Sequence, residues 1–406
     1  MTLDIFFQGI ASPARLIGTN GLADLLSDLA FGWPVTVATA DTSKTPFFSI
    51  SAIAGSDLLV CENHILPAPT RKLDTLNALC DLVAALAYAQ PNSDARLLCL
   101  HAAAVVVGGE LLIFPNVRRA GKSTLAVALA QAGHGLVGDD VVPLSFDAQG
   151  QGAALALGIS PRLRLPLPDT MTPAFRDWVQ GAEGQRNQQY HYVRIPDQPR
   201  HGTTFPVGAF VILDRQESPI PARIEPVSSD KAMDVIMFQN FTRDRHSGDV
   251  LRAMAAMLGA HPVLRLVYAD LESAVRCLEA AFPRRSDPAA AQGLGPARPF
   301  RMPDLRPYRG PDLHPMAKVA QRAGTECQMI GETLYLADPE GQAIRKMDPL
   351  AAVIWGLISE PSTEAELVDI LTAAYPGTDR GQIAADLTVL LRSWAVSGLI
   401  EVVSAG

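Results

Sequence analysis

The chain has 406 residues, of which 48% are hydrophobic and 19% charged, and its net charge is -8. This length exceeds the usual size of one hydrophobic core, so we expect two or three folded domains. The acidic balance argues against nucleic acid as the main partner, although local basic spots can still bind peptides.

Five cysteines lie scattered in apolar stretches, without metal-ligand spacing and without the even count of a disulfide framework. They predict free buried thiols in a reducing cytoplasm. The first residues include Asp4 and no basic leader, so we expect no signal peptide. No uncharged apolar stretch is long enough for a membrane span, so we expect no membrane partner and a cytoplasmic location. The cysteines are Cys61, Cys80, Cys99, Cys277 and Cys327.

Residues 1–95 are expected to form a small α+β module. Short extended runs at Pro34–Ala40 and Pro46–Ile53 precede a helix at about Asp74–Ala89, where apolar residues recur at helical spacing. The region carries no recognisable chemistry. We expect it to pack on the following domain and to shape a substrate cleft there.

A Gly-Gly pair at 108–109 between two apolar runs predicts a hairpin with a two-residue turn. If Val107 pairs with Glu110, counting back along both strands places His101 opposite Asn116. A lone histidine on an apolar strand is usually a core residue. At this position, however, a ring that titrates near neutrality suits proton or charge handling.

The strand expected at Leu111–Phe114 leads into a loop that ends in Gly-Lys-Ser-Thr, followed by an amphipathic helix. At the start of such a helix, unpaired backbone N–H groups converge and can bind a phosphate. Lys122 adds a mobile charge, and Ser123 or Thr124 can ligate magnesium. Asn116 stands where the usual phosphate-binding loop has glycine. The residues predicted to hold the nucleotide are Asn116, Ala120, Gly121, Lys122, Ser123 and Thr124.

A short strand expected at Gly135–Gly138 delivers Asp139 and Asp140 to the sheet edge at which the loop lies. Carboxylates there can hold Mg²⁺ and accept a substrate proton. An ordinary pair of turn aspartates is the alternative.

In these residues the segment resembles the HPr kinase/phosphorylase family and its relatives. The matches are His101, the AGKST run at 120–124 and the GHGLVGDD run at 133–140. The resemblance implies an α/β P-loop kinase core that transfers phosphate from ATP to serine. It further implies Asp139 as a base supported by His101, and Ser123 with Asp140 around Mg²⁺. Relatives of this kind are often homo-oligomers.

Weaker similarity to these kinases continues through GISPRLRLP at 158–166 and FPVGAFVILDR at 205–215. Arg162 or Arg164 could neutralise charge that develops on the transferred phosphoryl group. Solvated arginines on an edge strand are an equally good interpretation. We expect the core to run over residues 96–283 and to include helices at Ser229–Met237 and Asp249–Leu258.

Residues 284–312 are rich in proline, glycine and arginine and lack periodicity, which predicts an exposed linker. Residues 313–406 then predict three strands, three helices and a winged-helix-like α+β domain. The expected strands are Lys318–Ala323, Met329–Ala337 and Gln342–Met347, and the expected helices are Pro349–Ile358, Thr363–Tyr375 and Gln382–Gly398.

This last region resembles PqqD and related recognition domains of peptide natural-product biosynthesis. The resemblance rests on YLADPEGQAIRKMDPLAAVIWGLI at 335–358, on the STEAELVDIL run and on the terminal Gly-Leu-Ile at 398–400. It implies that a leader peptide adds as a strand along the third strand, beside the last helix. Trp355 is expected in the core. The residues expected to bind the peptide are Ile344, Arg345, Lys346, Met347 and Arg392, with Trp394 flanking them.

A winged helix also suggests DNA binding. Residues 313–406, however, contain six lysines and arginines against twelve aspartates and glutamates, a net charge of about -6. Because binding to phosphate backbones depends on cationic charge, we expect no nucleic-acid partner.

The leading hypothesis is therefore an ATP- and Mg²⁺-dependent kinase for a serine, or a threonine, of a ribosomally synthesised precursor peptide. One alternative is ATP-dependent activation of a peptide carboxylate or amide. Another is a nucleotide-gated peptide chaperone without catalysis. The chain lacks the signature of an ABC-type ATPase and the ligand cluster of a metal hydrolase.

Overall fold

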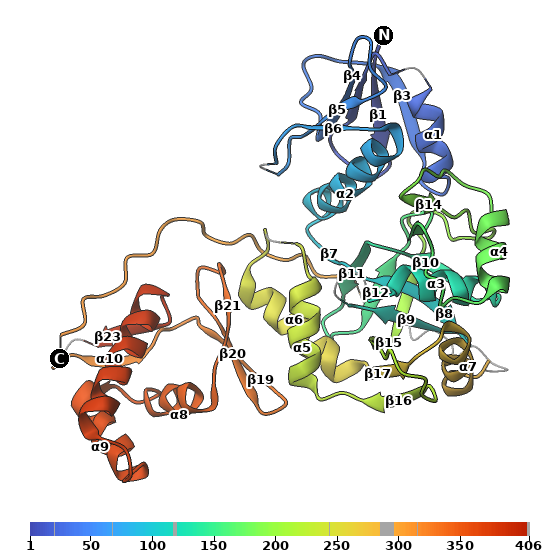
Figure 1. Ribbon diagram of the computed structural model, residues 1–406. Coiled ribbons are helices and arrows are strands. Elements are labelled where there is room, and N and C mark those ends of the chain that lie inside the picture. The colour runs from blue at the N-terminus through green and yellow to red at the C-terminus, as the bar shows by residue number, and fades with distance from the viewer. Residues whose placement is uncertain are drawn as a thin grey trace. The chain divides into compact units, whose positions relative to one another are not determined.

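The computed structural model describes residues 1–19, 21–66, 68–116, 120–242, 244–284, 296–314 and 316–403. Within these residues the fold is mixed α/β, with ten helices and several separate sheets (Figure 1). The chain divides into two compact units. Unit 1 comprises residues 1–243 and 257–299, and unit 2 comprises residues 244–256 and 300–406.

The N-terminal part of unit 1 is a six-stranded sheet in the order β3-β1-β2-β4-β5-β6, with two helices. The extended runs and the helix expected here are confirmed as β3, β4 and α2, and Asp74 caps α2 by accepting a hydrogen bond from the Asn77 amide. The elements are β1 (Thr2–Phe7), β2 (Ala14–Ile17), α1 (Leu22–Leu29), β3 (Val35–Thr39), β4 (Phe48–Ala52), β5 (Leu59–Asn63), β6 (Arg71–Leu73) and α2 (Thr75–Ser93).

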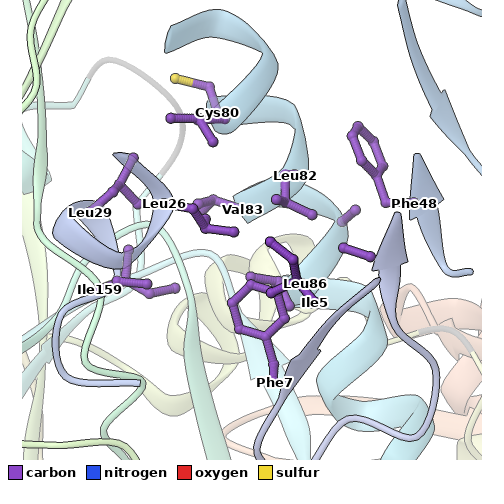
Figure 2. Close-up of a cluster of buried hydrophobic side chains, with 14 of the residues drawn as sticks. Ile5, Phe7, Leu26, Leu29, Phe48, Cys80, Leu82, Val83, Leu86 and Ile159 are labelled. Carbon is purple, nitrogen blue, oxygen red and sulfur yellow. The ribbon is translucent and has the colours of Figure 1, made fainter. Parts of the chain in front are cut away.

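The core of this module includes residues from the segment that follows it. Figure 2 shows Ile159 beside Leu29 of α1, in the cluster that contains Leu82, Val83 and other residues of α2. Burial on this scale contributes roughly 25 cal/mol per Å² of apolar surface removed from water. The N-terminal module therefore includes residues of the following segment in its core, whereas several strands of the following sheet contribute to a separate cluster.

The second sheet of unit 1 has nine strands, with the path β10-β8-β9-β15-β12-β11-β7. In addition, β17 pairs with β15 and with β16. Strands β9 and β17 are both parallel to β15. Strands β9 and β17 consist largely of buried apolar residues and β15 is buried in its middle part, as expected for the centre of such a sheet. The strands are β7 (Leu98–Leu100), β8 (Ala103–Val107), β9 (Glu110–Phe114), β10 (Gly135–Gly138), β11 (Val142–Phe146), β12 (Gly152–Leu155), β15 (Thr204–Arg215), β16 (Arg223–Pro226) and β17 (Val263–Tyr268).

Between residues 96 and 283 the sequence predicts some of the elements correctly. The expected hairpin forms with Val107 opposite Glu110, and the closing strand at 205–215 is confirmed. Strands β7, β11, β12, β14, β16 and β17 and helices α4 and α7 were not predicted. Besides the sheet, this region contains α3 (Lys122–Gln131), β13 (Arg162–Arg164), α4 (Pro173–Gly181), β14 (Tyr190–Tyr192), α5 (Ser229–Gln239), α6 (Ser247–Ala260) and α7 (Leu271–Ala281).

The described part of unit 2 contains two three-stranded sheets, β22-β18-β23 and β19-β20-β21. The strands expected at 318–323 and 342–347 are confirmed as β18 and β21, whereas β19, β22 and β23 were not predicted. The run Met329–Ala337 is interrupted by a hairpin, because Gly331 adopts a φ of 60° and reverses the chain. The elements are β18 (Lys318–Gln321), β19 (Glu326–Ile330), β20 (Thr333–Ala337), β21 (Ile344–Lys346), α8 (Pro349–Leu357), β22 (Ser362–Thr363), α9 (Glu364–Ala374), α10 (Arg380–Val396) and β23 (Ile400–Val403).

The three expected helices of unit 2 are confirmed as α8, α9 and α10. Trp355 and Trp394 are both buried and meet edge to face, with ring centroids 5.5 Å apart. Trp355 is therefore a core residue, as expected. Trp394 also belongs to the core rather than to an open groove.

The segment expected as a linker has no helix or strand in its described part, residues 296–312. Its second half nevertheless makes defined contacts within unit 2. The amide of Asp304 donates to the Glu340 carbonyl at 2.7 Å, and the Arg322 guanidinium lies 4.1 Å from the centroid of the Tyr308 ring. The four-part division of the chain drawn from the sequence remains a prediction.

The described cysteines form no disulfide, and not all of them are buried as the sequence predicts: Cys327 is exposed and Cys277 is half-buried. We find no helix among the described residues with the length and apolar character needed to cross a bilayer.

The close approach of Gly158 to Gly32 explains why both positions are glycine. The Gly32 amide donates to the Gly158 carbonyl at 3.0 Å, and a Cβ on Gly158 would lie 2.4 Å from the Gly32 carbonyl carbon. Gly158 also has a φ of 72°, which L side chains rarely adopt.

We predict that Gly158→Ala lowers the free energy of unfolding by about 3 kcal/mol, since it adds a backbone clash to left-handed strain. Gly55→Ala is the matched control, because Gly55 has a φ of 71° and a Cβ on it would meet no heavy atom within 4 Å. Urea unfolding should show the smaller loss for the control. Equal losses for both variants would contradict the clash.

Candidate functional site

The candidate site of unit 1 lies where β9 ends and α3 begins. Gly121 is the N-cap of α3 with a φ of 92°, and Lys122, Ser123 and Thr124 form the first turn. The first amides of a helix have no partner within the helix, so a helix start of this kind can bind an anion. Residues 117–119 of the loop lie outside the described residues.

Asn116, which replaces the expected glycine, joins the loop to the sheet. Its side-chain oxygen accepts from the Leu213 amide at 2.7 Å, and its side-chain nitrogen donates to the Leu213 carbonyl at 2.9 Å. The Asn116 carbonyl in turn accepts from Lys122 Nζ at 2.7 Å, and both residues are buried. The Asn116 side chain therefore connects the end of β9 to β15, and the Asn116 carbonyl fixes the position of the Lys122 ammonium group.

Asp139 and Asp140 follow β10 at the same edge of the sheet. Ser123 Oγ donates to Asp139 Oδ1 at 2.9 Å, and the Arg162 amide donates to Asp139 Oδ2 at 3.1 Å. Asp140 Oδ2 accepts from Arg162 Nη2 at 2.6 Å. Ser123 at the end of the loop thus contacts Asp139, whereas Asp140 contacts Arg162.

Asp140 occupies a tight turn in a left-handed backbone conformation. Its φ is 62°, and the Val141 amide donates across it to the Asp139 carbonyl at 2.7 Å. A non-glycine residue in this region costs about 1–3 kcal/mol and persists only where surrounding contacts hold it. The turn gives the two neighbouring carboxylates different surroundings, one against Ser123 and one against Arg162.

His101 reaches this site by a route other than the expected one. The β8–β9 ladder ends at Ala103 opposite Phe114, so its pairing does not extend to His101 and Asn116. The His101 amide instead donates to the Gln239 carbonyl at the end of α5. Its Nε2 lies 3.9 Å from Asp140 Oδ1, whereas we expected the ring to support Asp139.

Of the two candidate arginines, Arg162 contacts the carboxylates. Burial disfavours its charge, but Asp140, together with Tyr192 and Cys80, outweighs this effect and raises the pKa of Arg162. Its guanidinium also lies 4.9 Å from the centroid of the Tyr190 ring. Arg164 is exposed, and its guanidinium lies 5.8 Å from the centroid of the same ring.

Two residues beside Arg162 were not found from the sequence. The Tyr192 hydroxyl donates to Cys80 Sγ of α2 at 3.3 Å, and both side chains interact with the Arg162 guanidinium. An isolated cysteine in an apolar helix gives no signal for such a position. The N-terminal module therefore supplies part of the wall behind the candidate site.

The surroundings of Asp139 make it less acidic than an ordinary aspartate. Burial, followed by the charge of Asp140, raises the pKa of Asp139 to about 7, against the opposing hydrogen bonds from the Arg162 amide and Ser123. A divalent cation would offset both causes. The pair of oxygens from Ser123 and Asp139, 2.9 Å apart, is of the hard type that Mg²⁺ prefers.

Among the residues that the structure covers, no group of three or more His, Cys, Asp and Glu side chains could hold a metal ion. Magnesium in phosphoryl-transfer sites usually has one or two protein ligands and takes the others from water and phosphate. The donor set at Ser123 and Asp139 fits that kind of site.

In unit 2, β21 is an edge strand of the β19-β20-β21 sheet within the described residues. The Met347 amide donates to the Leu334 carbonyl, so the alternation of an antiparallel pair directs the backbone groups of Ile344 and Lys346 away from β20. Arg345 lies on the same face of the strand as the buried Met347. Arg392 lines a 440 Å³ pocket between α9 and α10, to which no residue of β21 contributes.

Comparison with known families matches residues 334–400 to the family described as Coenzyme PQQ synthesis protein D (PqqD), which confirms the resemblance expected for this region. Among solved structures, the chain matches the Hpr(Ser) kinase/phosphatase from Coxiella burnetii at 15% identity and a TM-score of 0.24. That match covers 45% of this chain and 93% of the other. A search of curated proteins finds no relative.

The raised pKa of Asp139 predicts a dependence of stability on pH. Between about pH 4 and pH 7 the folded protein keeps a proton on Asp139 that the unfolded chain releases, so stability falls as the pH rises through this window. We expect the free energy of unfolding to fall by roughly 2–4 kcal/mol from this group.

The measurement is urea unfolding of the protein and of Asp139→Asn at several pH values. The free energies of unfolding of the two proteins should be closest near pH 4. As the pH approaches 8, that of the variant should increase relative to that of the parent. A difference between them that stays constant with pH would contradict the raised pKa.

Proposed function

We propose that this chain is an ATP- and Mg²⁺-dependent kinase that phosphorylates a serine, or a threonine, of a ribosomally synthesised precursor peptide. The observation that carries the proposal is the direct bond between Ser123 of the helix-capping loop and Asp139, with Asp140 bound to Arg162 beside it. An anion-binding helix end, a metal-binding pair and a second carboxylate are the parts that phosphoryl transfer needs.

The distances favour a division of roles that differs from the one expected from sequence. Ser123 and Asp139 are bonded to each other, so we assign both to Mg²⁺, which neutralises charge on the phosphates of the donor. Asp140, with His101 at 3.9 Å, is then the acceptor for the proton of the substrate hydroxyl. The sequence hypothesis had Asp139 as base and Asp140 at the metal.

Lys122 and Arg162 supply the positive charge of the proposed reaction. Lys122 Nζ is held against the Asn116 carbonyl, close to the helix end that would bind the phosphates. Arg162 is bonded to Asp140 and can turn to the transferred phosphoryl group as negative charge develops there. Arg164 is exposed, and we assign it no role beyond long-range attraction of the donor.

For the peptide, the match of residues 334–400 to PqqD supports a precursor held by unit 2. We propose that its leader adds as a strand to the edge of β21, through the outward backbone groups of Ile344 and Lys346. Arg345, on the inner face of the strand, would favour acidic leader residues. Arg392 would serve in a separate contact, at the pocket between α9 and α10.

The division of roles predicts different defects for the two aspartates. Asp139→Asn should abolish Mg²⁺-dependent ATP binding, whereas Asp140→Asn should retain binding and lower transfer about a hundred- to ten-thousandfold, as expected for loss of a general base. Calorimetry measures the binding. Mass spectrometry follows phosphate on precursor peptides encoded by short reading frames beside the gene.

Asp197→Asn is the matched control for Asp140→Asn, because Asp197 is exposed and has a φ of 60°. It should leave binding and transfer unchanged. A modified peptide that lacks phosphate would favour ATP-dependent activation of a carboxylate or amide. Unchanged peptide modification in Asp139→Asn and Lys122→Ala would favour a chaperone.

The proposed leader site predicts that Ile344→Pro weakens leader binding about tenfold or more, because proline removes an outward N–H that an added strand would use. The β20–β21 hydrogen bonds do not use this N–H. Ile344→Ala keeps the N–H and serves as the control for the lost side chain. Fluorescence anisotropy with a labelled leader measures both, and equal affinities in the two variants would exclude augmentation at this edge.

A further inference from the structure

Beside the helix-capping loop, on unit 1, lies a recess that the proposed reaction has not used. It has a volume of about 30 Å³, enough for one or two groups the size of a hydroxyl. Its polar walls come from the first turn of α3, from Arg215 at the end of β15 and from the start of α7. The lining side chains that matter here are Thr124, Arg215, Tyr268, Asp270 and Glu272.

The Tyr268 hydroxyl is the unusual feature of this recess. The residue is 1% exposed, and its hydroxyl oxygen has no hydrogen-bond partner among the described residues. Burial raises the pKa of Tyr268 to about 12, so the group stays protonated and able to donate at neutral pH. A buried hydroxyl without a partner is costly, and native structures seldom keep one without a use.

The hydroxyl lies directly against the phosphate-binding loop. A Cβ on Gly121 would approach Tyr268 Oη to 3.2 Å, and Gly121 already needs its φ of 92°. The glycine therefore lets the loop backbone reach the hydroxyl. A ligand whose phosphates lie on the first amides of α3 would have a neighbouring group within reach of the recess.

The charges of the recess indicate the chemistry of that neighbouring group. One arginine stands against two carboxylates, so a further phosphate would meet net negative charge. Asp270 accepts from Ser273 and Glu272 accepts from Thr172, but each carboxylate has lone pairs left for another donor. A neutral group that both donates and accepts, such as a sugar hydroxyl, fits this mixture.

We propose that this recess binds the ribose hydroxyls of the nucleotide donor and that Tyr268 is a donor-binding residue. The inference rests on the proposed function, since it takes the phosphates of the donor to lie at the first turn of α3. Tyr268 then determines specificity for a nucleoside triphosphate over a simpler phosphate donor. Its hydroxyl is buried without a partner until the donor supplies one.

The test compares Tyr268→Phe with the parent protein, using ATP, 2′-deoxyATP and 3′-deoxyATP with Mg²⁺ and no peptide. Calorimetry should show roughly a three- to tenfold loss of ATP affinity in Tyr268→Phe, the cost of one hydrogen bond. The parent should bind one of the two deoxy nucleotides more weakly than ATP by a similar factor. Tyr268→Phe should bind that deoxy nucleotide almost as well as it binds ATP, because the hydrogen bond is already missing. Tyr88→Phe, on α2, is the control and should bind as the parent does.

Thermal unfolding provides a second readout that does not depend on turnover. Without nucleotide, Tyr268→Phe should unfold at the same or a higher temperature than the parent, because it removes an unsatisfied buried hydroxyl. With ATP, its stabilisation by ligand should be smaller. A lower unfolding temperature without nucleotide would overturn the inference, since it would mean that the hydroxyl already has a partner.

The outcomes separate this inference from the proposed function. Unchanged ATP affinity in Tyr268→Phe, or an equal loss with ATP and both deoxy nucleotides, overturns the ribose site and leaves the kinase proposal standing. ATP binding that depends on Tyr268 without any transfer of phosphate supports the ribose site alone. Failure of the parent to bind ATP overturns both.

Discussion

Two adjacent aspartates at one sheet edge are the constraint on which the candidate site depends. Side by side, Asp139 and Asp140 repel each other, and the structure relieves this with different partners for each: Ser123 and a backbone amide for one, Arg162 for the other. The left-handed backbone at Asp140 lets the two carboxylates reach different partners, and this conformation costs free energy locally. Burial, followed by the charge of Asp140, still raises the pKa of Asp139, so these contacts do not fully offset the two effects.

The N-terminal module contributes to the site through the β13–β14 sheet that carries Arg162. At the N-cap of α2, Asp74 accepts from Asn187, which lies just before β14, and further along the helix Cys80 accepts from Tyr192 of β14. The Gly32–Gly158 contact fixes the chain just before β13. The module therefore restrains the arginine that pairs with Asp140, which gives a physical reason for its presence.

The sequence predicts those parts of the site that local chemistry determines. The Gly-Lys-Ser-Thr turn, the hairpin at Val107 and the strand before Asp139 all depend on short-range patterns, and each forms as expected. The position of His101 was wrong in detail, because the chain leaves the hairpin at Ala103 and bonds to α5, a contact distant in sequence.

Other parts depend on long-range packing that one sequence does not reveal. Tyr268 follows an apolar run that marks a buried strand, and Asp270 caps the next helix, so β17 and α7 were accessible in principle. Strand β17 lies parallel to β15, and its last residue, Tyr268, lies against Gly121. Both placements depend on the order of strands in the sheet. The contact between Cys80 and Tyr192 also depends on long-range packing, since these residues are 112 positions apart and meet only in the folded chain.

The separate PqqD-like region has a consequence for how the proposed kinase would recognise its substrate. Unit 2 and the proposed kinase site of unit 1 belong to one chain. A precursor whose leader is bound by unit 2 would therefore present its modified residue to that site at an effective concentration on the order of millimolar. The site around Asp140 then needs little affinity of its own for the residue it modifies. Binding energy there can be kept for the transition state, where it accelerates the reaction, and sequence selectivity can reside in the edge of β21.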